Sequence, residues 1–373
     1  MKFKILHIIP SLQKGGAERL VLDICNELHS RAEIEVCLII FRNINEYKSL
    51  TDNIIFKIIP SRVIPSLSGK ATIEIDNLLS FINEFKPNVI HSHLFEAEIV
   101  SRWQILDGVK YITHCHDNMH QLQRFKLPDL FSKKRITELY EREKLLNRYK
   151  KCKNNFVAIS SHTKKYFNSI LPIELAKNIV LLHNAIDCRK FKIENRSYNE
   201  LILINIGSFV AKKNQIFFID IIKSLQKKNI YCKIILLGNG VLYNAVKLSV
   251  DMNGFSEIFT MPGNVSEVSN WLSNASIYVH SATYEPFGLV LLEAMAAGLP
   301  VITLNGGGNV DLIENGKNGF IIDEQNPELF ADKIIEIWEN KTLYNQISSN
   351  AQEFAQRFDI KEYVDKLIKL YKV

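Results

Sequence analysis

The sequence predicts an α/β protein made of two successive units, each with a parallel β-sheet that is buried on both faces. Short apolar runs alternate with longer helical segments along the chain. This alternation is interrupted once, by a polar stretch at residues 188–199, and then restarts. Near-continuous apolar strands separated by helices are typical of parallel sheets covered on both sides. The length of 373 residues agrees with two domains, at roughly 150 residues per domain.

The first predicted unit starts with a buried strand at residues 5–9 and a helix at residues 17–29. Within this helix Leu20, Ile24 and Leu28 recur at helical spacing. Further strands are predicted at residues 34–41, 54–59, 88–91, 110–114, 155–160 and 179–182.

The second predicted unit repeats this pattern after the polar stretch. Strands are expected at residues 201–206, 231–237, 257–261, 277–280, 300–304 and 319–322, with helices that include residues 215–226 and 327–339. We therefore place the two domains at residues 1–187 and 188–358. Two such units leave a cleft between them, and parallel sheets bind ligands beyond the carboxyl ends of their strands.

Composition describes an ordinary globular protein, with 47% hydrophobic and 23% charged residues. The net charge of +6 permits an anionic ligand, and no nucleic-acid partner is expected. The six cysteines include no C-x-x-C pair, so we expect free thiols in a reducing compartment. We find no convincing signal peptide. The longest apolar stretch contains Glu293 and Pro300 and cannot span a bilayer unaided. We expect a cytoplasmic location.

Glycine-bearing loops follow several predicted strands. Gly15-Gly16 follows the first strand and opens the first helix, where close backbone approach and free N–H groups favour an anion. The loop from Gly207 to Asn214 takes the same place in the second unit, and its lysines can hold a diphosphate. Gly238 follows the next strand. The alternative is a plain tight turn in each case. The fingerprint G-x-G-x-x-G is absent, which disfavours NAD.

The segment at residues 284–300 carries the strongest signal. A loop shaped by Pro286 and Gly288 precedes a predicted helix, whose first N–H groups would face an anion or hydroxyls. Glu285 stands before this helix, and Glu293 lies within its apolar run. A buried carboxylate needs a partner. Ribose hydroxyls would supply one, and so would a neighbouring backbone group.

Two glutamates eight positions apart, Glu285 and Glu293, resemble the E-x7-E signature of retaining glycosyltransferases of family 4. Other motifs follow in the order of that family along nearly the whole chain. They are Gly15-Gly16-Ala17-Glu18, His116-Asp117, His183-Asn184, the loop from Gly207 to Asn214, and Gly238-Asn239-Gly240. The resemblance implies a GT-B fold, with two Rossmann-like domains facing across a cleft. It also implies that a C-terminal helix at residues 359–373 crosses back to the first domain.

The resemblance implies a donor site for a nucleotide diphosphate sugar, with a UDP-linked sugar favoured over a GDP-linked one. Glu293 resembles the glutamate that holds the ribose, Glu285 the one that contacts the donor sugar, and Lys213 the diphosphate lysine. The remaining donor-binding residues by resemblance are backbone or loop positions: Gly16, Gly207, Asn214, Gly238, Phe287, Gly288 and Leu289. The catalytic set is His116, Glu285 and Lys213.

The acceptor side would be formed by His93, His116 and Asp117, with His116 near the transferred sugar. The resemblance implies a retaining, metal-independent reaction without a cofactor. It further implies a glycan or lipid-linked acceptor in bacterial surface polysaccharide assembly. Two departures stand out: Ser208 replaces a usual arginine, and Ala185 replaces a frequent glycine. Two alternatives therefore stay open: a non-catalytic partner subunit that binds a nucleotide sugar, and a sugar-nucleotide epimerase of the same fold.

Histidines gather at two predicted strand ends, as His91-Ser92-His93 and His114-Cys115-His116. Residues two apart share one face of a strand, which is compatible with a metal. No further ligands at suitable spacing are evident, so sugar or acceptor contacts are the favoured interpretation, with ordinary packing as the alternative.

The segment at residues 133–153 contains nine lysines and arginines against three glutamates. Its apolar residues are roughly helically spaced. A basic amphipathic helix on an anionic membrane and a solvated surface helix are equally compatible with this pattern. The first of these would make the protein peripheral on the inner face of the cytoplasmic membrane.

Overall fold

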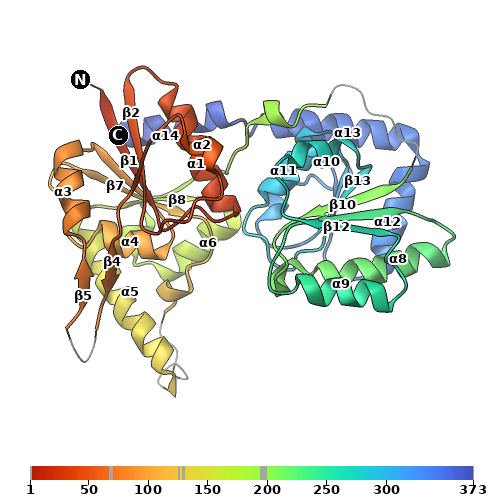
Figure 1. Cartoon of the computed structure of the whole chain (residues 1–373), viewed down its shortest axis with the longest axis horizontal. Coiled ribbons are helices and arrows are strands. Elements are labelled where there is room, and N and C mark those ends of the chain that lie inside the picture. The colour runs from red at the N-terminus through yellow and green to blue at the C-terminus, as the bar shows by residue number, and fades with distance from the viewer. Residues whose placement is uncertain (1, 67–69, 125–126, 128–130, 194–199, 373) are drawn as a thin grey trace. The chain divides into compact units, whose positions relative to one another are not determined.

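The computed structural model describes residues 2–66, 70–124, 127, 131–193 and 200–372 (Figure 1). The chain divides into two compact units. Unit 1 comprises Met1–Asn184 together with Ile360–Val373, and unit 2 comprises Ala185–Asp359. Each unit has its own parallel sheet with helices packed on it, so the predicted α/β class with two parallel sheets is confirmed.

Unit 1 is built on a seven-stranded sheet with the order β3-β2-β1-β6-β7-β8-β9, and every neighbouring pair is parallel. The strands are β1 (Phe3–Ile9), β2 (Ile34–Ile40), β3 (Ile55–Ile58), β6 (Val89–His93), β7 (Lys110–Cys115), β8 (Asn155–Ala158) and β9 (Ile179–Leu181). A small antiparallel pair, β4 (Arg62–Ile64) and β5 (Thr72–Glu74), was not predicted. Its strands are short and mostly exposed, so they lack the apolar run that marks a buried strand.

The helices of unit 1 are α1 (Gly16–His29), α2 (Lys48–Thr51), α3 (Asp76–Phe85), α4 (Phe95–Ser101), α5 (Lys133–Lys151), α6 (Ser161–Ile170), α7 (Ile173–Ala176) and α14 (Ile360–Lys372). The last of these, α14, packs against α1. Its Asp365 forms an ion pair with Arg31 at 3.0 Å, and Lys110 donates to the Leu370 carbonyl at 2.6 Å. The end of the chain is thereby part of unit 1.

Unit 2 contains a six-stranded parallel sheet with the order β12-β11-β10-β13-β14-β15. The strands are β10 (Ile202–Ile206), β11 (Lys233–Leu237), β12 (Phe259–Gly263), β13 (Ile277–His280), β14 (Val301–Leu304) and β15 (Phe320–Ile322). The helices are α8 (Phe218–Lys227), α9 (Tyr243–Met252), α10 (Val268–Ser273), α11 (Leu289–Ala296), α12 (Pro327–Glu339) and α13 (Lys341–Gln356).

Two local predictions differ from the structure. The helix expected at residues 215–226 begins as a 3-10 turn, Gln215–Phe217, before α8, because Asn214 turns the chain with a φ of 53°. The polar stretch at residues 188–199 opens with a 3-10 turn, Cys188–Lys190, and its residues 194–199 lie outside the described residues. In the described part of the chain, every helix is too short or too polar to cross a lipid bilayer.

Each sheet reverses its strand order at one point, between β1 and β6 in unit 1 and between β10 and β13 in unit 2. Loops that leave the carboxyl ends of such neighbouring strands run in opposite directions and leave room for a ligand. Four of the predicted site residues lie at the carboxyl ends of these strands. Gly16 comes after β1, His93 ends β6, Lys213 follows β10, and Glu285 follows β13.

Candidate functional site

An ion pair joins the two loops at the switch point of unit 2. Lys213 Nζ lies 2.5 Å from Glu285 Oε2, and both side chains are largely buried. The loops are also joined by their backbones and hydroxyls. Ser281 donates to the Lys213 carbonyl at 2.8 Å, and the Thr283 N–H donates to the Lys212 carbonyl at 2.9 Å. The predicted catalytic lysine and glutamate are therefore held together by their own unit.

Glu285 is kept charged by its two partners. Burial opposes its ionisation, but the Lys213 ammonium and a hydrogen bond from His280 hold the pKa of Glu285 well below its usual range. Burial lowers the pKa of His280, so the ring is neutral at pH 7 and its Nε2–H donates to Glu285 at 3.0 Å. Tyr278 reaches the other nitrogen, with its hydroxyl 3.3 Å from His280 Nδ1. The site thus presents a lysine that is already neutralised by a carboxylate.

Gly207 and Gly238 lie against one another where the loops after β10 and β11 meet. A Cβ on Gly238 would stand 2.1 Å from the Gly207 carbonyl oxygen, and its φ of 125° also requires glycine. A Cβ on Gly207 would approach the Lys213 side chain at 3.6 Å. Close packing of the two loops therefore accounts for Gly238.

The start of α11 lies directly after Glu285. Gly288 is the N-cap with a φ of 101°, and a Cβ there would come within 2.7 Å of the Leu291 side chain. The first N–H groups of a helix have no acceptor within it and attract anions or hydroxyls. Phe287 is buried and fixes the loop, and the Glu285 N–H donates to Gly306 at 2.7 Å. The predicted amides at residues 287–289 thus sit on a well-anchored turn.

Glu293 lies in the second turn of α11 and is half-buried. Burial, together with the negative charges of Glu285 and Glu293, raises the pKa of Tyr278. The charges of both glutamates of the E-x7-E motif therefore raise the pKa of the same tyrosine. The charge in this part of unit 2 comes from both carboxylates and from Lys213.

Ser208, which stands where a second cation is usual, is exposed on the loop after β10. Lys212 is exposed as well, and its Nζ lies over the Tyr284 ring, 5.1 Å from the centroid. The ammonium group of Lys212, which lies in the same loop as Ser208, thus contacts an aromatic ring.

In unit 1, Gly16 is the first residue of α1 and is exposed. Gly15 before it is extended, and a Cβ there would stand 2.3 Å from a carboxylate oxygen of Glu18. Burial raises the pKa of Glu18. Tyr47 closes this turn, because its hydroxyl lies 3.0 Å from the Gly15 nitrogen and 3.2 Å from its carbonyl oxygen. The glycine turn is thereby fixed at the start of a 14-residue helix.

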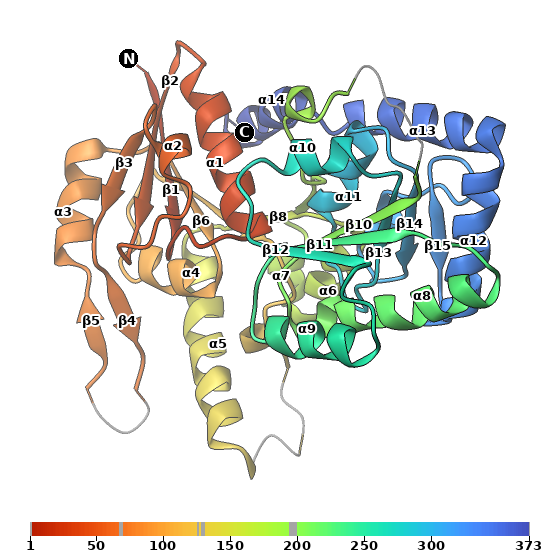
Figure 2. The same cartoon turned by 45° about the vertical axis from the view of Figure 1, so that its right-hand side comes forward.

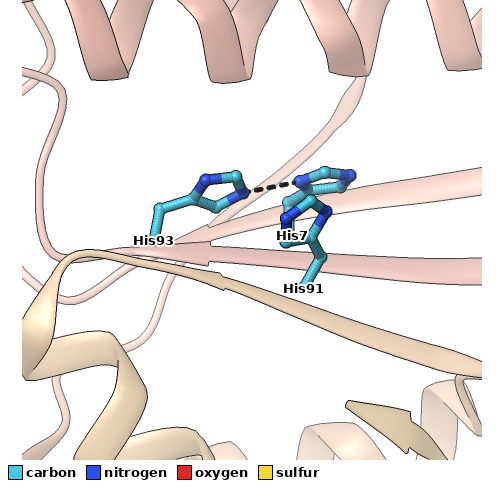
Figure 3. Close-up of side chains that lie close together, drawn as sticks. All are labelled: His7, His91 and His93. Atoms are coloured by element: carbon cyan, nitrogen blue, oxygen red, sulfur yellow. Dashed lines mark hydrogen bonds between the residues drawn. The ribbon is translucent and has the colours of Figure 1, made fainter. Parts of the chain in front are cut away.

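Five buried histidines lie together on one face of the unit 1 sheet; Figure 3 shows three of them, His7, His91 and His93. The strand registers bring them together, since His7 pairs with His91 and His93 pairs with His114. His116 follows β7, and its Nε2 lies 2.9 Å from His93 Nδ1. Burial lowers the pKa of all five rings, to about 3 for His7 and about 4 for His114. They are neutral at pH 7. Asp117 is half-buried, and its carboxylate accepts from the Asn118 N–H at 2.6 Å.

Two overlapping groups of these rings could hold a metal ion: His7, His91 and His93, and His93, His114 and His116. Within each group one ring nitrogen per residue lies within 4.8 Å of the others. However, His93 Nε2 lies 2.9 Å from His7 Nδ1, and His93 Nδ1 lies 2.9 Å from His116 Nε2. Two nitrogens bound to one tetrahedral zinc stand roughly 3.3 Å apart, from bonds of about 2.0–2.1 Å. Hydrogen bonding between the rings describes this arrangement better.

The structure adds functional candidates that the motifs did not single out. His280 bonds to Glu285, and a histidine at the carboxyl end of β13 was the available signal. His7 and Tyr371 join the histidine cluster, but they lie at opposite ends of the chain, and no spacing in the sequence connects them. Among the predicted residues, those of unit 2 gather around Lys213 and Glu285. Gly16, His93, His116 and Asp117 belong to unit 1.

The two parts of the chain each match a known protein family. Residues 188–354 match the family described as glycosyl transferases group 1, and residues 14–190 match glycosyltransferase family 4.

Three individual proteins are similar in sequence. One is the UDP-Gal:alpha-D-GlcNAc-diphosphoundecaprenol alpha-1,3-galactosyltransferase of Escherichia coli. It is 24% identical over 313 residues, covering 79% of this chain and 78% of that protein. An uncharacterised glycosyltransferase of Methanocaldococcus jannaschii is 27% identical over 208 residues, covering 56% of this chain and 57% of that protein. The capsular polysaccharide biosynthesis glycosyltransferase CapM of Staphylococcus aureus is 27% identical over 222 residues, covering 54% and 57%. The chain thus spans little more than half the length of the last two relatives.

Solved structures share the fold over the full chain. The Anabaena HepE structure in complex with UDP and glucose has a TM-score of 0.78 at 21% identity and covers 99% of both chains. WaaG, a glycosyltransferase involved in lipopolysaccharide biosynthesis, has a TM-score of 0.72 at 14% identity and covers 98% of this chain and 99% of WaaG. The two family matches meet near residue 190 and together run from residue 14 to residue 354. The chain belongs to the glycosyltransferases of family 4, and its two parallel-sheet units have the GT-B fold.

Proposed function

We propose that this glycosyltransferase moves a sugar from a nucleotide diphosphate sugar to a glycan or lipid-linked acceptor with retention of configuration. The observation that carries the proposal is the Lys213–Glu285 pair at the switch point of unit 2, directly before the start of α11. A departing diphosphate needs positive charge and aligned N–H groups where its negative charge develops. Lys213 and the first turn of α11 supply both within one unit.

The donor that fits this site is a nucleotide diphosphate sugar, with UDP favoured over GDP. A solved structure of the same fold contains UDP and glucose, and a relative is named for UDP-galactose. Glu293 would hold the ribose hydroxyls, and Glu285 would contact the sugar. On arrival the diphosphate competes with Glu285 for Lys213, which frees this carboxylate to accept hydrogen bonds from sugar hydroxyls. No metal and no cofactor take part in the proposed reaction.

The acceptor side is assigned to unit 1, with His93, His116 and Asp117. His116 is only 8% exposed and stands at the carboxyl end of the sheet, where a hydroxyl can approach it. The named relatives in Escherichia coli and Staphylococcus aureus act on a diphosphoundecaprenol-linked sugar or in capsular polysaccharide biosynthesis. By analogy, the acceptor of this chain is a lipid-linked glycan of a bacterial surface polysaccharide.

A lipid-linked acceptor gives α5 a role at the membrane surface. In Figures 1 and 2 its N-terminal half, in yellow, projects away from the unit 1 sheet. The first buried residue of α5 is Leu145, and the helix residues before it are exposed or half-buried. Phe131 just before the helix is 94% exposed, and Ile136 within it is 39% exposed. Basic residues beside exposed apolar ones favour an anionic lipid surface. We assign this role to residues 133–153.

The donor assignment is tested by a panel of sugar nucleotides, with nucleotide release and thermal shift as readouts. We expect Lys213→Ala to lower turnover by about 10²-fold, the loss that follows removal of one transition-state contact. Glu293→Ala is expected to raise the KM for the donor, because the ribose contact is the same before and during the reaction. Lys227→Ala is the control, because this lysine lies on α8 with a side chain that is 72% exposed. Full activity in both site variants would refute the residue assignments.

The same panel separates the alternatives. Tight nucleotide binding without release on any acceptor would identify a non-catalytic partner subunit, which the exposed Ser208 allows. A donor sugar that changes configuration without an acceptor would identify an epimerase. Release that depends on acceptor, with the anomeric configuration kept, supports the proposal.

A further inference from the structure

The carboxylate of Glu285 is held by two side chains through a single oxygen atom. Lys213 Nζ lies 2.5 Å from Glu285 Oε2, and His280 Nε2 lies 3.0 Å from the same atom. Glu285 Oε1 takes part in neither of these hydrogen bonds. One oxygen therefore anchors the side chain, and the other is left for a ligand.

The two anchors differ in charge and in exposure. The Lys213 side chain is 18% exposed, and its positive charge attracts the diphosphate of the proposed donor. The His280 side chain is only 1% exposed. Burial lowers the pKa of His280, so its ring is neutral at pH 7 and has no charge that would draw it toward a phosphate. We therefore expect a bound donor to weaken the contact of Lys213 with Glu285, whereas the contact of His280 persists.

The hydrogen of the bond between His280 and Glu285 belongs to His280. The pKa of Glu285 is held well below its usual range, and an ionised carboxylate only accepts, so His280 Nε2 carries the hydrogen. The acceptor nitrogen Nδ1 of the same ring lies 3.3 Å from the Tyr278 hydroxyl. The Tyr278 ring stacks on His280 with centroids 5.9 Å apart, and its hydroxyl lies 3.4 Å from the Ile206 carbonyl oxygen on β10. The sheet thus holds the His280 ring in place.

We propose that His280 is a positioning residue for glycosyl transfer: it keeps Glu285 aimed at the donor sugar while Lys213 holds the diphosphate. This inference rests on the proposed function. As the bond between the sugar carbon and the diphosphate oxygen breaks, its electron pair stays with the diphosphate and the sugar becomes positively charged. The acceptor hydroxyl oxygen bonds to this carbon, and its proton goes to the diphosphate. A fixed carboxylate stabilises the positive charge most in the transition state.

The first test compares His280→Leu with His280→Gln in steady-state kinetics at pH 7. Leucine fills the space without a donor, whereas a glutamine amide can donate to Glu285 in place of Nε2–H. We expect kcat of His280→Leu to fall by about 10- to 30-fold, at the low end for loss of a hydrogen bond to a charged group. The KM for the donor is expected to stay within about twofold. His280→Gln is expected to restore most of the loss in kcat.

Tyr344→Phe is the matched control, because it removes a buried hydrogen bond of unit 2 at the other end of the same strand. The Tyr344 hydroxyl donates to the carbonyl of Ser276, just before β13, whereas His280 is the last residue of β13. Both Tyr344→Phe and His280→Leu are expected to lower the midpoint of thermal unfolding. Only His280→Leu is expected to lower kcat, which separates positioning from a general loss of stability.

The second test needs no turnover. His280 is the only histidine between residues 185 and 359, and in ¹⁵N-histidine-labelled protein its signals are identified by their loss in His280→Leu. We expect a strongly deshielded Nε2–H in the wild type, in the wild type with UDP, and in Lys213→Met, because the bond to Glu285 remains in each. Glu285→Ala is expected to abolish the deshielding.

Four outcomes overturn the inference. Two are spectroscopic: a wild-type His280 ring with its proton on Nδ1, and a deshielded Nε2–H that is lost when UDP binds. Two are kinetic: a kcat of His280→Leu equal to that of Tyr344→Phe, and a His280→Gln variant no more active than His280→Leu. If the wild type transfers no sugar from any donor, the proposed function fails, and the spectrum of Lys213→Met still decides whether His280 alone holds Glu285.

Discussion

At the scale of single residues, the Lys213–Glu285 pair links the stability of unit 2 to its chemistry. Glu285 is buried and charged, and removal of its lysine leaves the carboxylate with His280 as its remaining side-chain partner among the described residues. We expect Lys213→Met to destabilise the protein by about 2–3 kcal/mol, less than a fully buried pair would lose, since Lys213 is partly exposed. The check is urea unfolding at pH 7 of Lys213→Met, Glu285→Gln and the double variant. If the losses in the free energy of unfolding of the two single variants add up to that of the double variant, with a coupling energy well below about 1 kcal/mol, the two side chains do not stabilise one another.

The histidine cluster predicts how stability depends on pH. The pKa is lowered to about 3 for His7 and to about 4 for His114, below the unfolded value of 6.5. Between these values the unfolded chain binds protons that the folded chain does not, so stability falls as pH falls below about 6.5. Each such ring adds a slope of about 1.4 kcal/mol per pH unit.

The measurement is urea unfolding at several pH values from 7 to 5. We expect His114→Gln to lower the slope of the free energy of unfolding against pH by the contribution of one buried ring. His29→Gln, at an exposed residue of α1, controls for the loss of a histidine elsewhere. A wild-type slope that His114→Gln leaves intact would show that this ring is not buried in neutral form.

At the scale of elements, α4 is fixed to the sheet by a buried ion pair on the face opposite to the histidines. Glu98 and Arg102 are both 0% exposed, and their closest atoms are 2.9 Å apart. Arg102 also donates to Asn154, and Glu98 accepts from Ser92 and Thr113 on β6 and β7. Every charged group here has several partners.

Removal of one partner of this pair leaves a buried charge uncompensated. We expect Glu98→Gln and Arg102→Met each to cost about 3–5 kcal/mol, and the double variant Glu98→Gln/Arg102→Met to cost less than the sum. Guanidinium unfolding gives these values. The surface pair between Lys317 and Glu314 is the control, because an exposed pair contributes about 0–1 kcal/mol. Equal losses at both pairs would refute the role of burial.

The basic helix α5 gives a prediction of its own. We expect the protein to bind vesicles of anionic lipid and to detach as salt is raised, because exposed charges are screened. Lys133→Gln/Lys134→Gln is expected to weaken binding by about 10- to 30-fold, at roughly 1 kcal/mol per lysine. Lys164→Gln/Lys165→Gln on α6 is the control with the same loss of charge. Equal binding to neutral vesicles, or equal effects of both variants, would speak against a docking helix.

Elements of the parallel sheets were predictable because each strand is a short apolar run bounded by polar loops. The strand at residues 277–280 and the helix at residues 327–339 have the predicted bounds, and most others shift by one or two residues. The positions of Gly207, Gly238 and Glu285 in loops after strands could be predicted for the same reason. The histidine cluster could not be predicted as a whole, because His7 and Tyr371 meet only through strand register and the return of α14.

At the scale of the whole molecule, the last helix makes unit 1 discontinuous in sequence. The buried residues of α14 are Ile360, Tyr363, Val364, Leu367 and Tyr371, and the helix packs on α1. A chain that stops after Asp359 should therefore lose cooperative unfolding of unit 1, while unit 2 keeps its own transition because residues 185–359 remain complete. Differential scanning calorimetry with limited proteolysis measures both. The exposed changes Lys366→Ala and Lys369→Ala in the full chain are the control. A truncated chain that unfolds like the full one would refute the assignment of α14 to unit 1.

The return of α14 also sets an order of assembly during synthesis. The ribosome delivers unit 2 as one contiguous stretch, and it delivers the 13-residue helix α14 of unit 1 only after the whole of unit 2. At about 5–20 residues per second, the nascent α1 and the histidine-lined strands wait many seconds for the segment that covers them. A chain that lacks α14 therefore has a complete unit 2 and an incomplete unit 1, which quality-control proteases can recognise by its uncovered apolar surface.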